Sequence, residues 1–273
     1  SLRLYLTLKL PAYVTALDVH LTPGCFHSEW AEDDVAQGAV VSLGSRVFTA
    51  SMSHRAWGGV ARVISRWLRH ERPDFRPLRI LDLGTSSGKN LIPYLEAYPQ
   101  AEAHGVDVAA PLLRYGHAIA EHEGVPIHFS QQNAEAMDFP DGHFDLIVSS
   151  FFFHEIRVEA TRHVLAECRR LLRPGGMMVH QELPATKLVG AWEDYFWNWD
   201  TENNNEPFYT AFRAQDPISL CAEAGFERER SFAQILPDVN AYPDRFHAFA
   251  WDEPGRPRHG KGGWYVFGSS LPA

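Results

Sequence analysis

The stretch Arg79–Asn90, with the sequence RILDLGTSSGKN, decides the fold. The run Leu78–Gly84 is short and apolar and reads as a buried strand, and a helical pattern begins at Asn90. Between them, a glycine or small residue at alternate positions (84, 86 and 88) lets the backbone turn sharply and approach a ligand closely. A strand, a tight loop and a helix in this order predict a ligand-binding unit of a parallel α/β sheet.

The sequence around this stretch continues the alternation of strands and helices. Helical patterns cover Asn90–Tyr98, Pro111–Glu123, Val158–Leu172 and Pro217–Ala224. Strand patterns cover Glu102–Val108, Ile127–Gln131, Phe144–Ser150, Gly176–Glu182, Glu227–Leu236 and Trp264–Ser269. We therefore predict an α/β fold with a doubly wound, mostly parallel, seven-stranded Rossmann-like sheet that ends in an antiparallel edge pair.

Two regions fall outside this alternation and set the predicted domain organisation. Residues 1–75, helical around Trp57–His70, are expected to form an N-terminal helical extension packed on the core. Residues 76–273 are expected to form the ligand-binding domain. Within it, residues 183–216 are too long for a plain connection, so we predict a lid insertion after the fifth strand of that domain.

Composition excludes several classes of protein. The 273 residues carry 25 basic and 34 acidic side chains, a net charge of −9, and this disfavours a nucleic-acid binder. The three cysteines, Cys25, Cys168 and Cys221, have no CxxC spacing, which argues against disulfides and cysteine-bound zinc. The fourteen histidines show neither an HExxH motif nor a two-histidine-plus-carboxylate spacing, so no metal site is predicted.

The sequence offers no membrane or export signal. Ser1–Val14 alternates apolar and polar residues and lacks the continuous apolar core of a signal peptide. No window approaches the ~18 apolar residues of a membrane-spanning helix. We therefore expect a cytoplasmic protein that does not bind membranes. Ser1 in place of methionine suggests that the native start is missing or processed.

The loop itself separates two kinds of cofactor. A dinucleotide site of the GxGxxG type would need glycine where Ser86 and Lys89 stand, so that pattern fails twice. The pattern acidic-x-Gly-x-small-x-Gly is met from Asp82 to Gly88. It suits S-adenosylmethionine (SAM), which has no pyrophosphate and brings a carboxylate, an ammonium and a sulfonium. Asp107 lies 19 residues after Gly88, where a ribose-binding acid belongs, although it could instead cap the following helix.

Four segments in order resemble the class I SAM-dependent methyltransferases, and among them the bacterial small-molecule branch that includes the ubiquinone-biosynthesis type. They are RILDLGTSSGKN, HGVDVAAPLLRYGHA, QQNAEAMDFPDGHFDLIVSS and RLLRPGGMMV, within Arg79–Glu182. The resemblance implies SAM as cofactor. It implies contacts to the methionine end from Asp82, Gly84, Thr85 and Gly88, to the ribose from Asp107, to the adenine from Asn133 and Ala134, and under the methionine from Ser149 and Ser150.

Two further residues join this cofactor set, Ser86 in the loop and Val108 beside Asp107. Ser86 departs from the family, which often has glycine there, but it is small enough to fit. Asn133 also departs, because the family often has aspartate. The change replaces a charged acceptor by a neutral amide, so we expect a weaker adenine contact.

The strand Phe144–Ser150 runs directly into Phe151-Phe152-Phe153-His154-Glu155, which places two candidate catalytic groups near the transferred methyl. Methyl transfer needs an aligned nucleophile and exclusion of water, and an oxygen or nitrogen nucleophile also needs a base. His154 is suited to that task near neutral pH, but it could equally cap or pack the helix from Val158. Glu155 is the weaker candidate, because glutamate is common at helix starts.

The segment Ala191–Tyr209 (AWEDYFWNWDTENNNEPFY) is dense in aromatic and hydrogen-bonding side chains. In the resembling family this stretch commonly covers the substrate. We therefore predict substrate contacts from Trp199, Asp200, Asn204, Asn205 and Glu206. The alternative is an amphipathic helix that packs on the sheet through Trp192, Tyr195, Phe196 and Trp199, and both can hold at once if the polar turn Glu202–Glu206 points into the site. The polar stretch Asp18–Gly24 reads better as an ordinary turn than as a lining of the pocket mouth.

Together these features predict methyl transfer from SAM to an oxygen, nitrogen or carbon atom of a small metabolite. Two alternatives are a protein of this fold with non-methylating chemistry, and a catalytically silent binding or partner protein. Nucleic acid is disfavoured further because Ser149-Ser150-Phe151-Phe152 does not resemble the Asn/Asp-Pro-Pro-Tyr signature of base-amine methyltransferases.

Overall fold

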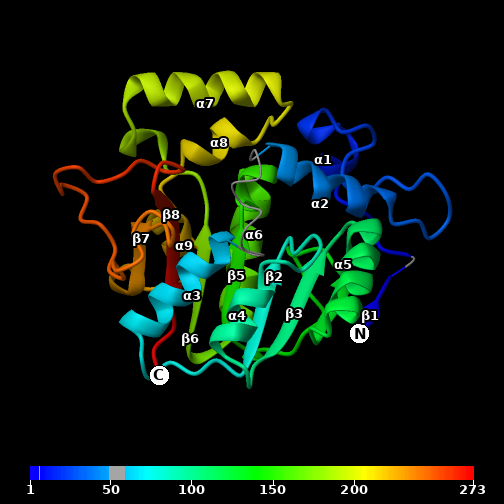
Figure 1. The fold of residues 1–273 in the computed structure, drawn as a ribbon, viewed down its shortest axis with the longest axis horizontal. Helices are drawn as coiled ribbons and strands as arrows, with labels where there is room; N and C mark the ends of the chain where they lie inside the picture. Colours follow the sequence, from blue (N-terminus) through cyan, green and yellow to red (C-terminus); the bar gives the residue numbers. More distant parts are fainter. Residues whose placement is uncertain (6, 49–58) are drawn as a thin grey trace.

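A central sheet of eight strands organises the computed structural model, which describes residues 1–5, 7–48 and 59–273 (Figure 1). The strand order is β1-β4-β3-β2-β5-β6-β8-β7, and only β8 runs against its neighbours. The strands are β1 (Leu2–Arg3), β2 (Arg79–Leu83), β3 (Glu102–Asp107), β4 (Ile127–Gln131), β5 (Phe144–Ser150), β6 (Leu172–Gln181), β7 (Ser231–Pro237) and β8 (Gly263–Ser270).

Helices cover both faces of this sheet, as the doubly wound prediction requires. The α-helices are α1 (Ala12–Thr15), α2 (Ala36–Phe48), α3 (Gly59–Glu71), α4 (Leu91–Ala97), α5 (Ala110–Glu123), α6 (Val158–Leu171), α7 (Ala191–Asn203), α8 (Tyr209–Arg213) and α9 (Pro217–Glu223). Short 3₁₀ turns are η1 (Val19–Leu21), η2 (Phe153–Glu155), η3 (Thr186–Leu188) and η4 (Arg228–Arg230).

Strand alternation divides the core into two layers. Ile80 faces a layer that includes α3, α4 and α5, whereas its neighbour Leu81 faces a layer that includes α6, α8 and α9. The two clusters lie on opposite faces because successive side chains of a strand point to opposite sides. This arrangement leaves the carboxyl edge of the parallel strands to the loops, where ligands of open α/β sheets bind.

The fold class is confirmed, with one difference in strand count. The eighth strand, β1, pairs with β4 through Leu2 and Arg3 in a region that we had expected to be only an extension. A two-residue edge strand is too short to leave a periodic signal in the sequence. β1 belongs to the central sheet, and α3 belongs to the layer that covers it. The division of the chain into an extension (1–75) and a ligand-binding domain (76–273) stays a prediction. Of the helix predicted at Trp57–His70, the part from 59 onward is α3 (Gly59–Glu71), and Trp57 lies outside the described residues.

The segment predicted as a lid forms α7 and α8, which lie at one edge of the sheet (Figure 1). The alternative that this segment is a helix packed on the sheet through its aromatic face is wrong. The side chains of that face are exposed: Trp192 (71%), Tyr195 (56%), Phe196 (49%) and Trp199 (54%). Thr201 is instead the buried residue of this helix. Among the described helices, none is long and apolar enough to cross a membrane.

Candidate functional site

The carboxyl end of β2 carries a buried, partly unsatisfied carboxylate. Asp82 is fully buried, and its Oδ2 accepts a hydrogen bond from Thr85 Oγ1 at 2.8 Å. Its Oδ1 is buried and has no hydrogen-bond partner. Burial and the nearby charge of Asp107 raise the pKa of Asp82 to about 7, against the opposing effect of the Thr85 hydrogen bond. A polar ligand that reached Oδ1 would remove the cost of this unsatisfied buried atom.

The loop after Asp82 adopts the tight conformation that its small residues predict. Gly84, Ser86 and Gly88 have φ values of 62°, 51° and 75°, in the left-handed region. Ser86, the departure from the family pattern, adopts this conformation although it carries a Cβ. The backbone therefore turns as a glycine loop would at all three positions.

Asp107, at the end of β3, ties this loop to the next strand. Its Oδ2 accepts the backbone N–H of Ser86, and its Oδ1 accepts that of Ala109, each at 2.9 Å. Burial raises the pKa of Asp107, and these backbone hydrogen bonds oppose the shift. Asp107 thus has a local structural role, and ribose binding stays a prediction for it. We call Asp82, residues 84–88 and Asp107 the loop edge.

A phenylalanine ring occupies the space that a side chain at position 84 would need. A Cβ on Gly84 would lie 2.5 Å from Phe152 Cδ2, so the loop and the residues after β5 are in direct contact. The glycine is required here both by its positive φ and by the approach of this ring. Phe151, the preceding residue, also has a left-handed φ of 56°.

The other residues predicted to contact the cofactor lie near the same carboxyl edge but differ in where they point. Ser149 is buried and hydrogen-bonds His180 Nδ1 at 2.9 Å, so its hydroxyl is already engaged. Ser150 faces the opposite side of β5. It pairs with Gln181, whose buried amide has no hydrogen-bond partner at either polar atom. The strand register places Ser150 and Gln181 on the same face as Asp82.

At the adenine end, Ala134 is buried, and Asn133 Oδ1 accepts the backbone N–H of Glu135 at 3.0 Å, so the asparagine forms a turn. Val108 instead lines a cavity of about 180 Å³. The cavity lies between the N-terminal segment and the ends of β3 and β4, and it is lined by Tyr5, Leu8, Leu10, His27, Glu29, Val108, Ala110, Arg114 and Gln131. This cavity adjoins Asp107, where the sequence predicts the ribose.

Beyond the end of β5, five ionisable side chains meet, and we call them the carboxylate–histidine cluster: His20, His154, Glu155, Glu182 and Glu206. His154 Nδ1 lies 2.8 Å from Glu182 Oε2, and its Nε2 lies 3.7 Å from both Glu155 Oε1 and Glu206 Oε2. His20 Nε2 lies 3.0 Å from Glu155 Oε1, and its Nδ1 lies 3.3 Å from Glu206 Oε1. The cluster is mostly closed to solvent, since Glu182 and Glu206 are buried.

The carboxylates decide the charge of both histidines. Burial by itself lowers the pKa of His154, but Glu182, Glu155 and Glu206 outweigh it and raise the pKa to about 9. The same competition, with Glu155 and Glu206 as the opposing charges, raises the pKa of His20 to about 10. His154 is therefore an imidazolium at neutral pH in this arrangement, and it is not poised as a free base.

The structure places some of the predicted lid residues at the carboxylate–histidine cluster and leaves Trp199 away from it. Asn204 Nδ2 lies 2.7 Å from His20 Nδ1, and Asn205 donates to the backbone oxygen of Asp18 at 2.8 Å. Burial and the nearby charge of Glu206 raise the pKa of Asp200, and His20 opposes this shift. Trp199 is not brought to the cluster, because its side chain lies in the exposed aromatic face of α7.

Comparison with known proteins agrees with this geometry. Residues 80–176 match the family model described as a methyltransferase domain. Residues 80–176 form a methyltransferase domain. The predicted resemblance to the class I SAM-dependent methyltransferases and their ubiquinone-biosynthesis branch is confirmed, and so is SAM as the cofactor that such a domain uses.

Two curated relatives illustrate how far the likeness extends. The chain is 38% identical over 108 residues to the demethylmenaquinone methyltransferase of Thermus thermophilus, which covers 40% of this chain and 48% of the relative. It is 29% identical over 180 residues to the ubiquinone/menaquinone biosynthesis C-methyltransferase of Dinoroseobacter shibae, covering 61% and 68%. The chain spans about half the length of the first curated relatives that it matches, 48% and 55%.

Solved structures share the fold. An O-methyltransferase family protein from Burkholderia thailandensis has a TM-score of 0.56 at 14% identity, over 89% of this chain and 64% of that one. The Haemonchus contortus phosphoethanolamine N-methyltransferase 2 in complex with S-adenosyl-L-methionine has a TM-score of 0.52 at 15% identity, over 76% and 51%. At these identities the likeness establishes the fold alone.

The sequence pointed to three of the five cluster residues and not to the other two. His154, Glu155 and Glu206 were singled out, but His20 was assigned to an ordinary turn and Glu182 only to the end of a strand. The signal for His20 was present in the polar stretch Asp18–Gly24, yet a contact across 184 residues, such as Asn204 to His20, leaves no local pattern.

Proposed function

We propose that this chain transfers a methyl group from SAM to an oxygen, nitrogen or carbon atom of a small-molecule metabolite. The observation that carries the proposal is the loop edge within the methyltransferase domain. There a tight loop, the buried carboxylate of Asp82 and the half-buried carboxylate of Asp107 stand together at the carboxyl edge of the sheet, and one oxygen of Asp82 has no partner.

The cofactor supplies an electrophilic methyl on a sulfonium when it is bound. Residues 84–88, with Thr85 and Ser86, would hold the methionine end, and Asp82 Oδ1 offers an acceptor suited to its ammonium group. Asp107 and Val108 would hold the ribose and the adjoining adenine, because Val108 lines the neighbouring cavity. Asn133, Ala134, Ser149 and Ser150 complete the proposed contacts, although the hydroxyl of Ser149 is already bound to His180.

The acceptor would lie between the loop edge and the carboxylate–histidine cluster. Phe152 touches Gly84, and the next residue, Phe153, donates its backbone N–H to Glu182 Oε1 at 2.6 Å. Consecutive residues therefore join the two places. His154 and Glu155 would act on the acceptor from the cluster side, and the turn Asp200–Glu206 would cover it and exclude water.

The remaining expectations about partners follow from charge and hydropathy. A net charge of −9 suits a small metabolite better than a nucleic acid. We also propose a cytoplasmic protein with no membrane partner, supported by three buried cysteines without a disulfide and by the hydropathy of the chain.

The test is a titration followed by a transfer assay. Calorimetry with SAM and with S-adenosylhomocysteine should give one binding site per chain. Incubation with methyl-labelled SAM and a panel of small hydroxyl, amine and enol acceptors should give a product heavier by one methylene unit together with S-adenosylhomocysteine. Cofactor binding without any transfer across the panel would favour the silent binding protein, and no binding would refute the proposal.

A further inference from the structure

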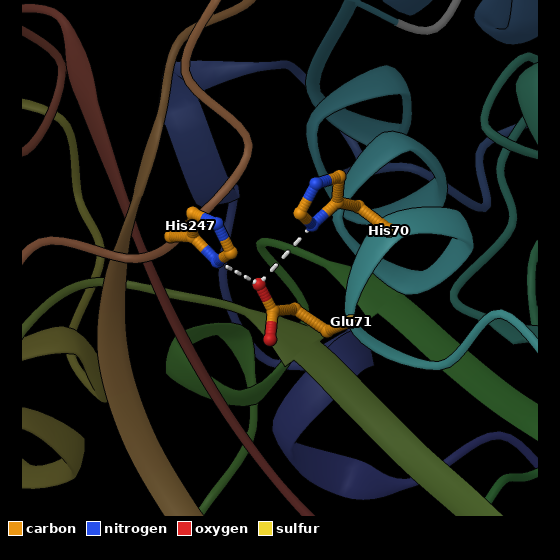
Figure 2. A group of neighbouring side chains, drawn as sticks. All are labelled: His70, Glu71 and His247. Carbon is orange, nitrogen blue, oxygen red and sulfur yellow. Dashed lines mark hydrogen bonds and ion pairs between the residues drawn. The ribbon is translucent and has the colours of Figure 1, made fainter.

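Two groups of histidine and carboxylate side chains in the described part of the chain place their ligand atoms within reach of a single metal ion: His70, Glu71 and His247, and His20, Glu155 and Glu206. Figure 2 shows the first group at the end of α3, where the two imidazoles approach one carboxylate. Its histidine side chains are 40% and 69% exposed, so this group lies at the surface.

The second group differs because it belongs to the carboxylate–histidine cluster, and although His20 is 37% exposed, the Glu206 side chain is only 3% exposed. Three of its members, His20, Glu155 and Glu206, each offer one ligand atom within 4.8 Å of the other two. His154 adds Nε2, which lies 3.7 Å from Glu155 Oε1 and 3.7 Å from Glu206 Oε2. His20 would bind through one ring nitrogen, either Nε2, 3.0 Å from Glu155 Oε1, or Nδ1, 3.3 Å from Glu206 Oε1. Metal–ligand bonds of 2.0–2.2 Å in a tetrahedron put donors roughly 3.3–3.6 Å apart, so both imidazoles lie within reach of an ion held between the two carboxylates.

We propose that His20, His154, Glu155 and Glu206 bind one divalent transition-metal ion of the Zn²⁺, Fe²⁺ or Mn²⁺ class. Two imidazole nitrogens with two carboxylate oxygens match the ligand preferences of these ions. Ca²⁺ and Mg²⁺ favour sets made only of oxygen ligands, so the two histidines argue against them.

Glu182, which contacts the proposed ligand His154, supports this assignment. Glu182 holds His154 through Nδ1, at 2.8 Å, which leaves Nε2 directed at Glu155 and Glu206. Glu182 is itself fixed by the backbone N–H groups of Phe153 at 2.6 Å and Leu183 at 3.0 Å. A carboxylate that fixes the second nitrogen of a ligating histidine is the arrangement that orients such ligands in metal sites.

The turns that carry His20 and Glu206 contain left-handed backbone conformations. His20 and Leu21 both have left-handed φ values, 55° and 53°, and Asn205, beside Glu206, has 53°. Conformations of this kind persist where the surrounding structure holds them. Here the hydrogen bond from Asn205 to Asp18 joins the two turns that carry His20 and Glu206.

Metal binding itself is independent of methyl transfer. Its role, however, rests on the proposed function. An ion at this place would take an acceptor oxygen as a further ligand and favour its deprotonated form. The acceptor class would then be a hydroxyl, phenol or enol.

The experiment measures Zn²⁺ binding by the full chain after treatment with a chelator and removal of that chelator. The double variant His70→Ala/His247→Ala removes the surface group of Figure 2 and serves as the background. Equilibrium dialysis with Zn²⁺ should give one ion per chain in this background. Bound Co²⁺ should give the visible absorption of a four-coordinate site.

Further variants in that background locate the ion. His20→Ala and Glu206→Gln should each weaken Zn²⁺ binding at least ~10-fold, and Glu182→Gln should weaken it ~10-fold or more through His154. Glu202→Gln, an exposed glutamate of α7, is the matched control and should leave Zn²⁺ affinity unchanged. Circular dichroism and melting of each variant exclude loss of fold as the cause.

Three results would overturn the proposal: no Zn²⁺ bound in the background variant, binding that Glu206→Gln leaves unchanged, or binding lost equally in Glu202→Gln. Titration of SAM into the same samples separates this proposal from the proposed function. Zn²⁺ binding without SAM binding would refute methyl transfer alone, and SAM binding without Zn²⁺ binding would refute the metal site alone.

Discussion

The loop edge and the carboxylate–histidine cluster lie side by side but differ in how their polar groups are satisfied. At the loop edge, Asp82 Oδ1 is buried without a partner, and the amide of Gln181 nearby is also unpartnered. In the cluster, all five ionisable side chains face one another at 2.8 to 3.7 Å. The loop edge is thus built to be completed by a ligand, whereas the cluster is complete in itself until a metal or substrate replaces its internal contacts.

The largest expected effect is at Gly84. Gly84→Val should abolish SAM binding, because its Cβ would meet Phe152 at 2.5 Å and a β-branched residue is strained at a φ of 62°. Calorimetry and a melting curve measure both consequences. Gly84→Ala/Phe152→Leu relieves the clash but keeps the φ, and should recover part of the melting temperature. If Gly84→Val binds SAM normally, the loop is not the cofactor site.

The next effect is at Asp107. Asp107→Ala should weaken SAM binding by ~1.5–3 kcal/mol, about 10- to 150-fold, because a charged acceptor for buried ribose hydroxyls is lost. The variant should also melt earlier, since the N–H groups of Ser86 and Ala109 lose their acceptor. Asp107→Asn keeps one acceptor oxygen and is the milder control. Earlier melting with unchanged SAM affinity would leave Asp107 with its structural role only.

Glu206 tests the other region. Glu206→Gln should reduce turnover about 10-fold or more and change SAM affinity by less than about twofold, since its contacts are with His20 and His154 and not with the loop edge. Turnover is measured once the acceptor panel has given a substrate. Glu123→Gln, an exposed glutamate at the end of α5, is the control for charge and should behave as the wild type. An equal loss of SAM affinity in Glu206→Gln would mean that the two regions are one site.

The pH dependence of stability should distinguish the two regions as well. Asp82 has a folded-state pKa of about 7, above its usual 3.8, so the folded state holds a proton that the unfolded state has lost. Its contribution is present below about pH 4 and disappears as the pH rises to 7. Over that window the wild type should lose up to ~1.4 kcal/mol per pH unit relative to Asp82→Asn.

Denaturant unfolding at several pH values measures this difference. Saturating S-adenosylhomocysteine should reduce it, because the ligand's ammonium favours the ionised carboxylate. A difference that stays constant from pH 4 to 7, with or without ligand, would contradict the assignment of Asp82.

The smallest effect is expected at the hydrogen bond between Asn205 and Asp18, which joins the turn after α7 to the turn near residue 20. Asn205→Ala removes the hydrogen bond to the Asp18 backbone, worth about 0.5–1.5 kcal/mol. The variant also loses an asparagine that suits a left-handed φ of 53°. Its melting temperature should fall by a few degrees, with SAM affinity unchanged. No change in melting would show that the turns hold without this bond.

The loop edge could be predicted from the sequence, whereas the carboxylate–histidine cluster could be predicted only in part. The loop edge is local: Asp82, Gly84, Ser86 and Gly88 fall within one strand–loop–helix unit, and spacing alone places Asp107 beside them. The cluster is assembled from the turn near residue 20, the end of β5, the end of β6 and the turn after α7. Glu155 and Glu206 could be proposed from their neighbours, but His20 and Glu182 needed tertiary structure.

The aromatic residues of the lid segment show why periodicity was not enough. Trp192, Tyr195, Phe196 and Trp199 have the spacing of a buried helix face, yet they are exposed. The buried side of α7 is instead held by polar and charged contacts, such as Arg213 to Asp194 at 2.7 Å. An apolar stripe predicts a face that favours burial, but it does not say which partner buries it.

The central claim is that the loop edge holds SAM independently of the cluster. Its most direct test is calorimetric titration of S-adenosylhomocysteine into the wild type, Asp107→Ala and Glu206→Gln under one set of conditions. We expect one site per chain in the wild type, the same affinity within about twofold in Glu206→Gln, and a loss of about 10-fold or more in Asp107→Ala. Absence of binding to the wild type, or an equal loss in both variants, would contradict it.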